Sequence, residues 1–200
     1  MTKALIVVDM QNDFMPGGAL GVKGAFEIVQ PILKLMPKFS HIIASQDWHP
    51  KNHCSFAATH PGKKVGDTIQ IRGQAQHLWP VHCVQNTKGA EFAPGFSKEQ
   101  FEAIFHKGTD PSIDGYSAFY DNAHEKSTGL TSYLHKHHIT QIVLVGLAFD
   151  YCVFYSALDA CRDGFEVTVL PELCRSINTS PVEHKKILET LQLQGVRLAL

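Results

Sequence analysis

The 200-residue sequence carries little charge, because acidic and basic side chains together make up only 18% of it. Its 18 lysines and arginines nearly cancel its 19 aspartates and glutamates. The low content of charged residues excludes a disordered chain and a coiled coil. The near balance of charge excludes a global electrostatic field that would attract nucleic acid or an anionic membrane. We therefore expect no nucleic-acid partner and no membrane partner.

Long apolar runs are also missing, since no run approaches the roughly 20 residues of a membrane span. The first carboxylate, Asp9, follows an apolar run of only five residues, which is too short for the core of a signal peptide. The five cysteines have no regular spacing, and none fits a zinc-finger pattern. Reduced thiols in the cytoplasm are therefore expected in place of a disulfide framework.

Short β-branched runs alternate with helical patterns along the chain. Strands are predicted at residues 4–8, 41–45, 103–105, 141–145 and 166–170, with an edge strand at 196–200. Helices are predicted at residues 24–38, 127–138, 150–163 and 181–194, the third ended by Gly164 and the last begun by a Ser180–Glu183 capping box. This alternation is typical of an α/β fold with a doubly wound, mainly parallel sheet and helices on both faces.

The length suits a single domain over residues 1–200, and the sequence contains no linker, internal repeat or low-complexity segment. Residues 46–100 interrupt the alternation, being rich in glycine, proline and histidine and only weakly periodic. Six of the twelve histidines fall between residues 41 and 82. Because a loop this long inside a compact domain is usually functional, we expect a functional loop region at about 46–100.

Reactive and metal-ligating residue types directly follow several predicted strands. Asp9 follows the first strand, Asp47 and His49 follow the second, Lys107 follows the third, and Cys152 comes shortly after the fourth. In an open α/β sheet, ligands bind outside the carboxyl ends of the strands. We therefore expect these side chains to gather at one edge of the sheet.

Cys152 is predicted in the first turn of the helix at residues 150–163. Unpaired N–H groups and the helix dipole there favour thiolate over thiol, whereas a buried and inert cysteine is the alternative. Asp9 can accept the thiol proton, and Lys107 can hold both anions in place. The N–H groups of Cys152 and of the preceding turn can bind an oxyanion.

A candidate metal site lies in the loop region. Its residues are one carboxylate and up to three imidazoles: Asp47, His49, His53 and His82. This donor set suits a divalent zinc, manganese or iron ion with further positions open to water, and it does not identify the metal. A histidine-rich polar loop without a metal is the alternative.

Several segments match a known family in the family's order and span residues 4–174. They are Val8-Asp9-Met10-Gln11-Asn12-Asp13-Phe14, Gln46-Asp47-Trp48-His49-Pro50, Asn52-His53-Cys54-Ser55-Phe56, Leu78-Trp79-Pro80-Val81-His82-Cys83-Val84, Lys107-Gly108-Thr109-Asp110, Tyr116-Ser117-Ala118-Phe119 and Gly146-Leu147-Ala148-Phe149-Asp150-Tyr151-Cys152-Val153. On these segments the chain resembles the nicotinamidase/pyrazinamidase family, within the isochorismatase-like cysteine hydrolases.

The resemblance implies the isochorismatase-like hydrolase fold and hydrolysis of nicotinamide to nicotinate and ammonia through a cysteine thioester. It also implies activity on pyrazinamide and a role in NAD salvage. Carried over by position, Cys152 is the nucleophile, Asp9 its base and Lys107 the third triad member. A cis peptide at Leu147–Ala148 is implied, and the N–H groups of Ala148 and Cys152 form the oxyanion hole.

The resemblance further implies one divalent metal ion, with zinc favoured over iron and manganese, bound by Asp47, His49 and His82. His53 matches a position that ligates the metal in some members and is replaced by water in others. The matching aromatic pocket residues are Phe14, Trp79 and Tyr116.

Phe149 departs from the family pattern, because many members have a small polar residue at this position. Three alternatives stay open: an amidohydrolase of the same superfamily acting on a carbamoyl or ureido substrate, an enzyme that uses a metal with Cys152 as a bystander, and a ligand-binding module without catalysis. The sequence does not give the oligomeric state, and a homo-oligomer is compatible with it.

Overall fold

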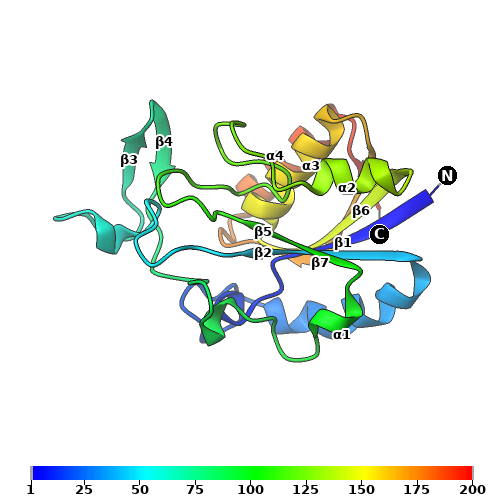
Figure 1. The fold of residues 1–200 in the computed structure, drawn as a ribbon, viewed down its shortest axis with the longest axis horizontal. Coiled ribbons are helices and arrows are strands. Elements are labelled where there is room, and N and C mark those ends of the chain that lie inside the picture. Colours follow the sequence, from blue (N-terminus) through cyan, green and yellow to red (C-terminus); the bar gives the residue numbers. More distant parts are fainter. Residues whose placement is uncertain (1, 200) are drawn as a thin grey trace.

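A six-stranded sheet with the strand order β5-β2-β1-β6-β7-β8 forms the centre of the protein (Figure 1). The computed structural model describes residues 2–199. The strands are β1 Thr2–Val8, β2 His41–Asp47, β5 Ala103–Lys107, β6 Ile139–Leu147, β7 Glu166–Arg175 and β8 Arg197–Leu198. Every neighbouring pair in this sheet runs parallel, which confirms the predicted doubly wound α/β fold.

The central strand β1 is buried on both faces, as its continuous apolar run predicts. Ala4, Ile6 and Val8 pack into the core on one face, whereas Leu5 and Val7 pack into the core on the other. From β1 the chain moves outward through β2 to β5 and then returns to β6 on the opposite side of β1. This reversal creates a topological switch point at the carboxyl ends of β1 and β6, where such folds bind ligands.

Helices cover both faces of the sheet. Helix α1, Ala25–Leu35, lies below the sheet in Figure 1, and α2, Leu130–Lys136, α3, Phe154–Arg162, and α4, Pro181–Leu193, lie above it. Gly164 follows α3 with φ +89°, and the Ser180 hydroxyl accepts the Glu183 N–H at 3.5 Å, so both predicted helix ends are confirmed. Within residues 2–199, no helix has the length and apolar character needed to cross a bilayer.

Several strands extend beyond the apolar runs that predicted them. β2 continues to Asp47, β5 to Lys107 and β7 to Arg175, because ladder hydrogen bonds join backbone groups and do not need apolar side chains. The predicted edge strand at 196–200 is present as β8, Arg197–Leu198, and Leu200 lies outside the described residues.

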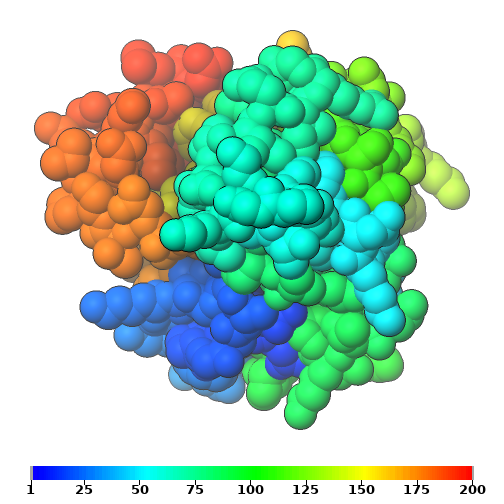
Figure 2. Space-filling model, turned by 90° about the vertical axis from the view of Figure 1, so that its left-hand side faces the viewer, coloured from blue at the N-terminus to red at the C-terminus, as the bar shows by residue number. Residues whose placement is uncertain are grey.

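The loop region contains an antiparallel hairpin that the sequence did not predict. Its strands are β3, Thr68–Ile71, and β4, Gln74–His77, and its turn residues Arg72 and Gly73 have φ values of +48° and +78°. Two positive φ values are typical of a tight hairpin turn, but arginine is an unusual residue there and gave no signal. The hairpin and its flanking loops project over the carboxyl end of the sheet (Figures 1 and 2).

Candidate active site and metal centre

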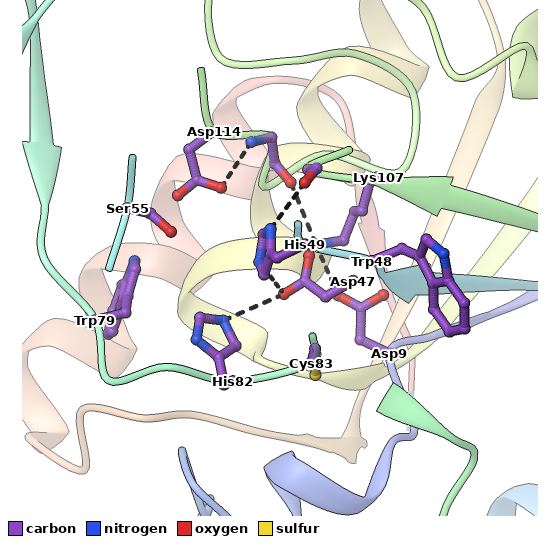
Figure 3. Close-up of polar contacts among 12 residues, drawn as sticks. Asp9, Asp47, Trp48, His49, Ser55, Trp79, His82, Cys83, Lys107 and Asp114 are labelled. Carbon is purple, nitrogen blue, oxygen red and sulfur yellow. Dashed lines mark hydrogen bonds and ion pairs between the residues drawn. The ribbon is translucent and has the colours of Figure 1, made fainter. Parts of the chain in front are cut away.

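The carboxyl ends of three neighbouring strands bring Asp9, Asp47 and Lys107 together (Figure 3). Lys107 Nζ lies 2.9 Å from Asp9 Oδ2 and 3.2 Å from Cys152 Sγ, and it also forms an ion pair with Asp47. All four side chains are buried. The structure thus assembles the three predicted triad residues in one place, while their catalytic roles stay predictions.

Asp9 is held in place by its backbone and by a hydroxyl group. It directly follows β1 with φ +49°, a left-handed conformation that aspartate adopts more readily than most residues other than glycine. Its N–H donates to the carbonyl of Ser45 at 3.2 Å, and the Ser45 hydroxyl donates to Asp9 Oδ1 at 2.6 Å. These contacts direct the second carboxylate oxygen toward Lys107.

Cys152 lies in a π-helical segment, Phe149–Val153, that connects β6 to α3. Burial raises the pKa of its thiol well above the usual value, and the nearby carboxylates of Asp9 and Asp47 raise it further against the opposing effect of Lys107. Burial and the two carboxylates therefore oppose the thiolate that the helix start was expected to favour. A base is needed, and burial also raises the pKa of Asp9, which brings its proton affinity toward that of a base.

The peptide bond Leu147–Ala148 is cis, as the family resemblance implies. The carbonyl of Ala148 accepts the N–H groups of Tyr151 at 3.1 Å and Val153 at 3.0 Å, which fixes the turn before α3. Ala148 and Cys152 both line one small pocket. Their role as an oxyanion hole stays a prediction.

The predicted metal ligands Asp47, His49 and His82 form one compact group, with all three ligand atoms within 4.8 Å of one another. Asp47 Oδ2 lies 3.5 Å from His49 Nε2 and 3.6 Å from His82 Nε2. The other ring nitrogen of each histidine contacts a backbone carbonyl, Gly108 for His49 at 2.9 Å and Pro80 for His82 at 2.7 Å.

These backbone contacts determine what the two histidines present to Asp47. A carbonyl only accepts hydrogen bonds, so Nδ1 carries the hydrogen in both rings, and in a neutral ring Nε2 then offers a lone pair. Two such lone pairs and a carboxylate oxygen therefore face one point. That arrangement requires a cation there, either a proton or a metal ion.

The charge of the site also fits a divalent cation. Asp9 and Asp47 are both buried against a single buried amine, Lys107. Burial alone would raise the pKa of Asp47, but Lys107 and His49 outweigh it and hold that pKa well below the usual range. Asp47 therefore stays ionised, and a buried carboxylate facing two imidazole nitrogens suits a divalent cation.

Gly108 supports this geometry through its backbone. Its φ of +61° favours glycine, and a side-chain carbon at this position would collide with the His49 ring. The residue after Lys107 therefore lets the backbone approach close enough for its carbonyl to orient His49.

His53 has a different environment from the other three candidate ligands. Its Nδ1 contacts the Ser55 hydroxyl at 2.7 Å and its Nε2 contacts the carbonyl of Ile113 at 3.2 Å. Burial and the neighbouring His49 lower its pKa to about 4. Its ligand atom groups with those of His49 and Asp114 and not with that of Asp47, so its role as a fourth ligand stays a prediction.

A small pocket beside the Cys152 thiol is lined by the three predicted aromatic residues, Phe14, Trp79 and Tyr116. Trp79 Nε1 lies 3.4 Å from the Tyr116 hydroxyl, and the Phe14 ring centroid is 5.7 Å from that of His82. The departure from the family pattern, Phe149, does not line this pocket: it packs in the core, with its ring 5.2 Å from that of His184.

The protein-family model of the isochorismatase domain matches residues 3–199 of this chain. The chain belongs to the isochorismatase family. Among its relatives in this family, a nicotinamidase of Escherichia coli is 40% identical over 98% of this chain and 93% of its own length. A nicotinamidase of Acinetobacter baylyi is 45% identical over 88% of this chain and 82% of its own length.

Solved structures of nicotinamidases and pyrazinamidases share the fold. A nicotinamidase/pyrazinamidase of Acinetobacter baumanii superposes with a TM-score of 0.94 at 43% identity, over 98% of this chain and 95% of that one. The yeast nicotinamidase bound to the inhibitor nicotinaldehyde superposes with a TM-score of 0.94 at 35% identity, over 99% of each chain. The pyrazinamidase of Pyrococcus horikoshii in complex with zinc superposes with a TM-score of 0.82 at 35% identity, over 100% of this chain and 99% of that one.

Sequence reasoning missed several residues that shape this isochorismatase-family site. Gln11 donates its amide to the carbonyl of Asp47 at 2.8 Å and accepts the Asp47 N–H at 2.9 Å, and so fixes the backbone of a candidate ligand. Tyr151 and Asp114 line the pocket. Gln11 and Tyr151 lie inside segments that carry the family resemblance, which was the available signal, whereas Asp114 had none.

Proposed function

We propose that this protein is a nicotinamidase, which hydrolyses nicotinamide to nicotinate and ammonia. The observation that carries the proposal is the position of Lys107 Nζ between Asp9 and Cys152, the residue of the three that lines an aromatic pocket. Relatives and solved structures with this name support it. The product nicotinate suggests a role in NAD salvage.

In the proposed reaction Asp9 accepts the proton of the Cys152 thiol, and the resulting thiolate attacks the carboxamide carbon. Lys107 keeps both groups in contact and offsets their negative charge. The N–H groups of Ala148 and Cys152 bind the oxyanion, an interaction worth on the order of 3 kcal/mol for each donor. The carbon–nitrogen bond then breaks, and Asp9 gives its proton to the departing ammonia.

The second half of the reaction restores the enzyme. A water molecule attacks the thioester while Asp9 accepts its proton. The bond between carbon and sulfur breaks, Asp9 returns the proton to Cys152, and the nicotinic acid that leaves releases its own proton to solvent to become nicotinate. In this scheme Asp9 accounts for each proton transfer within the enzyme, which agrees with the raised pKa of its buried carboxyl.

Asp47, His49 and His82 would hold one divalent metal ion, and zinc is the ion named in the Pyrococcus horikoshii structure. When bound there, the ion supplies a Lewis acid for the ring nitrogen of the substrate. Zinc, iron and manganese all accept one carboxylate with imidazoles, so we propose zinc first and the other two as alternatives.

The pocket favours a small, planar and neutral ring. Trp79 meets Tyr151 edge-on, with ring centroids 4.9 Å apart, and Tyr116 meets Tyr151 at 5.3 Å. Aromatic walls of this kind bind flat heterocycles through stacking and edge contacts. We therefore propose pyrazinamide as a second substrate.

We also propose a single catalytic domain over residues 1–200 that acts in the cytoplasm, with the 46–100 loop region completing the metal site. The sheet takes strands from both ends of the chain, and His49 and His82 both come from the loop region. The five cysteines are free thiols, which suits a reducing compartment.

The decisive experiment measures ammonia release from nicotinamide before and after chelation. We expect turnover by the purified protein, loss after chelation and recovery with added zinc. Parallel assays with carbamoyl and ureido substrates address the alternative amidohydrolase, and mass spectrometry of a trapped thioester on Cys152 addresses the metal-only alternative. Binding of nicotinamide without ammonia release would contradict the proposed function.

A further inference from the structure

The β3–β4 hairpin has one buried side chain, although most of its residues are exposed. Of residues 68–77, all of which the structure describes, only Gln76 is buried. Side chains alternate between the two faces of a strand, so Gln76 lies on the same face of β4 as the exposed Gln74. Burial of an amide has a desolvation cost, which the hydrogen bonds of Gln76 must offset.

The amide nitrogen of Gln76 donates to three oxygen atoms. Nε2 lies 2.7 Å from the carbonyl oxygen of His77, 3.0 Å from Asp114 Oδ2 and 3.3 Å from the Tyr116 hydroxyl oxygen. A carbonyl and a carboxylate only accept hydrogen bonds, so the amide must turn its nitrogen, and not its oxygen, toward them. Position 76 therefore requires a hydrogen-bond donor.

Two of these three acceptors belong to residues of the aromatic pocket. Asp114 and Tyr116 both line that pocket, whereas Gln76 contacts them from behind and does not line it. Asp114 Oδ1 accepts the N–H of Gly115 at 2.9 Å, and Gln76 supplies the donor for the other carboxylate oxygen. The hairpin thus acts on the pocket through one side chain.

The Tyr116 hydroxyl lies between two N–H donors. Gln76 Nε2 lies 3.3 Å from its oxygen, and the indole nitrogen of Trp79 lies 3.4 Å from it. Because both neighbours donate, the tyrosine oxygen accepts, and its own hydrogen is left for another acceptor. Trp79 comes two residues after β4, so both donors belong to the hairpin and the chain that leaves it.

The turn of the hairpin has a second polar attachment, which is exposed. Arg72 lies 2.9 Å from a carboxylate oxygen of Glu125 and 3.0 Å from the Ser112 hydroxyl oxygen. The side chains of Arg72 and Glu125 are 47% and 63% exposed, and ion pairs in water contribute little. The buried hydrogen bonds of Gln76 therefore contribute more to the position of the hairpin.

We propose that Gln76 is a positioning residue for substrate binding, which holds Asp114 and Tyr116 in the aromatic pocket and makes the hairpin part of the substrate site. Without the amide, the Asp114 carboxylate loses a buried donor and turns to find another, which changes the pocket that the substrate ring enters. The proposal rests on the proposed nicotinamidase function, since it names a determinant of nicotinamide binding.

Steady-state kinetics with nicotinamide test the proposal through two variants. Gln76→Met keeps a similar side-chain volume and removes the donor, whereas Gln76→Glu places an oxygen against a carbonyl and a carboxylate. We expect the KM to rise about fivefold in the first variant and further in the second, with kcat within about twofold of normal. The reason is that, within residues 2–199, no hydrogen bond joins Gln76 to the proposed catalytic triad.

Gln70→Met and Gln70→Glu are the matched controls, since Gln70 is exposed on the partner strand β3. The same chemical changes there should leave both KM and kcat near normal. An unchanged KM in Gln76→Met, or a fall in kcat without a change in KM, would overturn the proposal. Urea unfolding identifies variants that fold, and Gln76→Met carries the test if Gln76→Glu does not fold.

A spectroscopic measurement tests the positioning without substrate. The chain has two tryptophans, so its proton–nitrogen NMR spectrum has two indole N–H resonances, and Trp48→Phe identifies the one from Trp79. Because the Trp79 indole donates to the Tyr116 hydroxyl, this resonance should move in both Gln76 variants and stay in place in both Gln70 variants.

An unmoved Trp79 resonance in Gln76→Met would overturn the claim that Gln76 positions Tyr116. The two measurements also separate this inference from the proposed function. Absence of turnover by the unmodified protein would refute the nicotinamidase activity, whereas the indole resonance tests the contacts of Gln76 in the ligand-free protein in either case.

Discussion

Two clusters of histidine and carboxylate lie at opposite ends of the same pair of strands, β2 and β5. The carboxyl-end cluster consists of Asp47, His49 and His82, and the amino-end cluster consists of His41, Glu102 and His137. Each offers one carboxylate and two imidazoles, so composition alone does not distinguish them. Their surroundings do.

In the amino-end cluster His41 Nδ1 contacts Glu102 Oε2 directly, at 2.8 Å, with side chains 22% and 36% exposed. In the carboxyl-end cluster no side chain is more than 7% exposed, and Nδ1 of each histidine forms a hydrogen bond with a backbone carbonyl. The two clusters share residue types, so the hydrogen bonds on the far ring nitrogens and the exclusion of water are what favour the carboxyl-end cluster as the metal site.

The largest expected effect lies next to the carboxyl-end cluster. Cys152→Ala should lower kcat/KM for nicotinamide by at least about four orders of magnitude, because it removes the nucleophile. Ammonia release measures the loss. Cys161→Ala, which replaces a half-buried thiol in α3, is the control and should stay near normal activity. A Cys152 variant within tenfold of the normal rate would refute the nucleophile assignment.

Metal content compares the two clusters directly. The double variant His49→Ala/His82→Ala should lose its metal, whereas His41→Ala/His137→Ala should keep a full equivalent, as measured by elemental analysis after desalting. Only the first pair has its Nε2 atoms directed at a buried carboxylate. The opposite result would assign the metal to the exposed end of the sheet.

Stability should also differ between the two ends of β5. Lys107→Ala leaves Asp9 and Asp47 buried without their cation and should cost about 3–5 kcal/mol in the free energy of unfolding. Glu102→Gln at the exposed end should cost less than about 1 kcal/mol. Urea unfolding of both variants after chelation measures the difference, and equal losses would show that burial does not separate the two clusters.

The smallest effect concerns acid sensitivity at the amino end. Burial works to raise the pKa of Glu102, but hydrogen bonds from His41 and Tyr133 outweigh it and hold that pKa below the ordinary value of 4.5. The stabilisation from this carboxylate is therefore complete above pH 4.5 and is lost as the pH falls through the folded pKa.

The Glu102→Gln variant should accordingly lose slightly less stability than the unmodified protein when the pH falls below 4.5. Urea midpoints measured from about pH 3 to about pH 6 test it. Identical acid profiles for the variant and the unmodified protein would contradict the lowered pKa.

Much of the fold was predictable because its strongest signals are local. The apolar run at residues 4–8 specifies a strand buried on both faces, and Ser180 with Pro181 marks the start of α4. The β3–β4 hairpin was not predictable in the same way, because each strand has only four residues and its turn places an arginine in a left-handed conformation.

The positions of the site residues follow from topology, but their protonation does not. Parallel strands deliver Asp9, Asp47 and Lys107 to one edge, so their meeting could be predicted from strand ends. The raised pKa of Cys152 depends on burial and on two carboxylates from other strands, which only the assembled structure shows. The same holds for Gln11, whose partner is distant in sequence.

Asp47 divides its two carboxylate oxygens between two tasks. Oδ1 pairs with the ammonium of Lys107, and Oδ2 faces the imidazoles of His49 and His82. Replacing this single residue would disturb cation binding and the acidity of the nucleophile at once. A defect in an Asp47 variant therefore combines a metal contribution and a thiol contribution. Substitutions of His49 or His82 separate the metal contribution better.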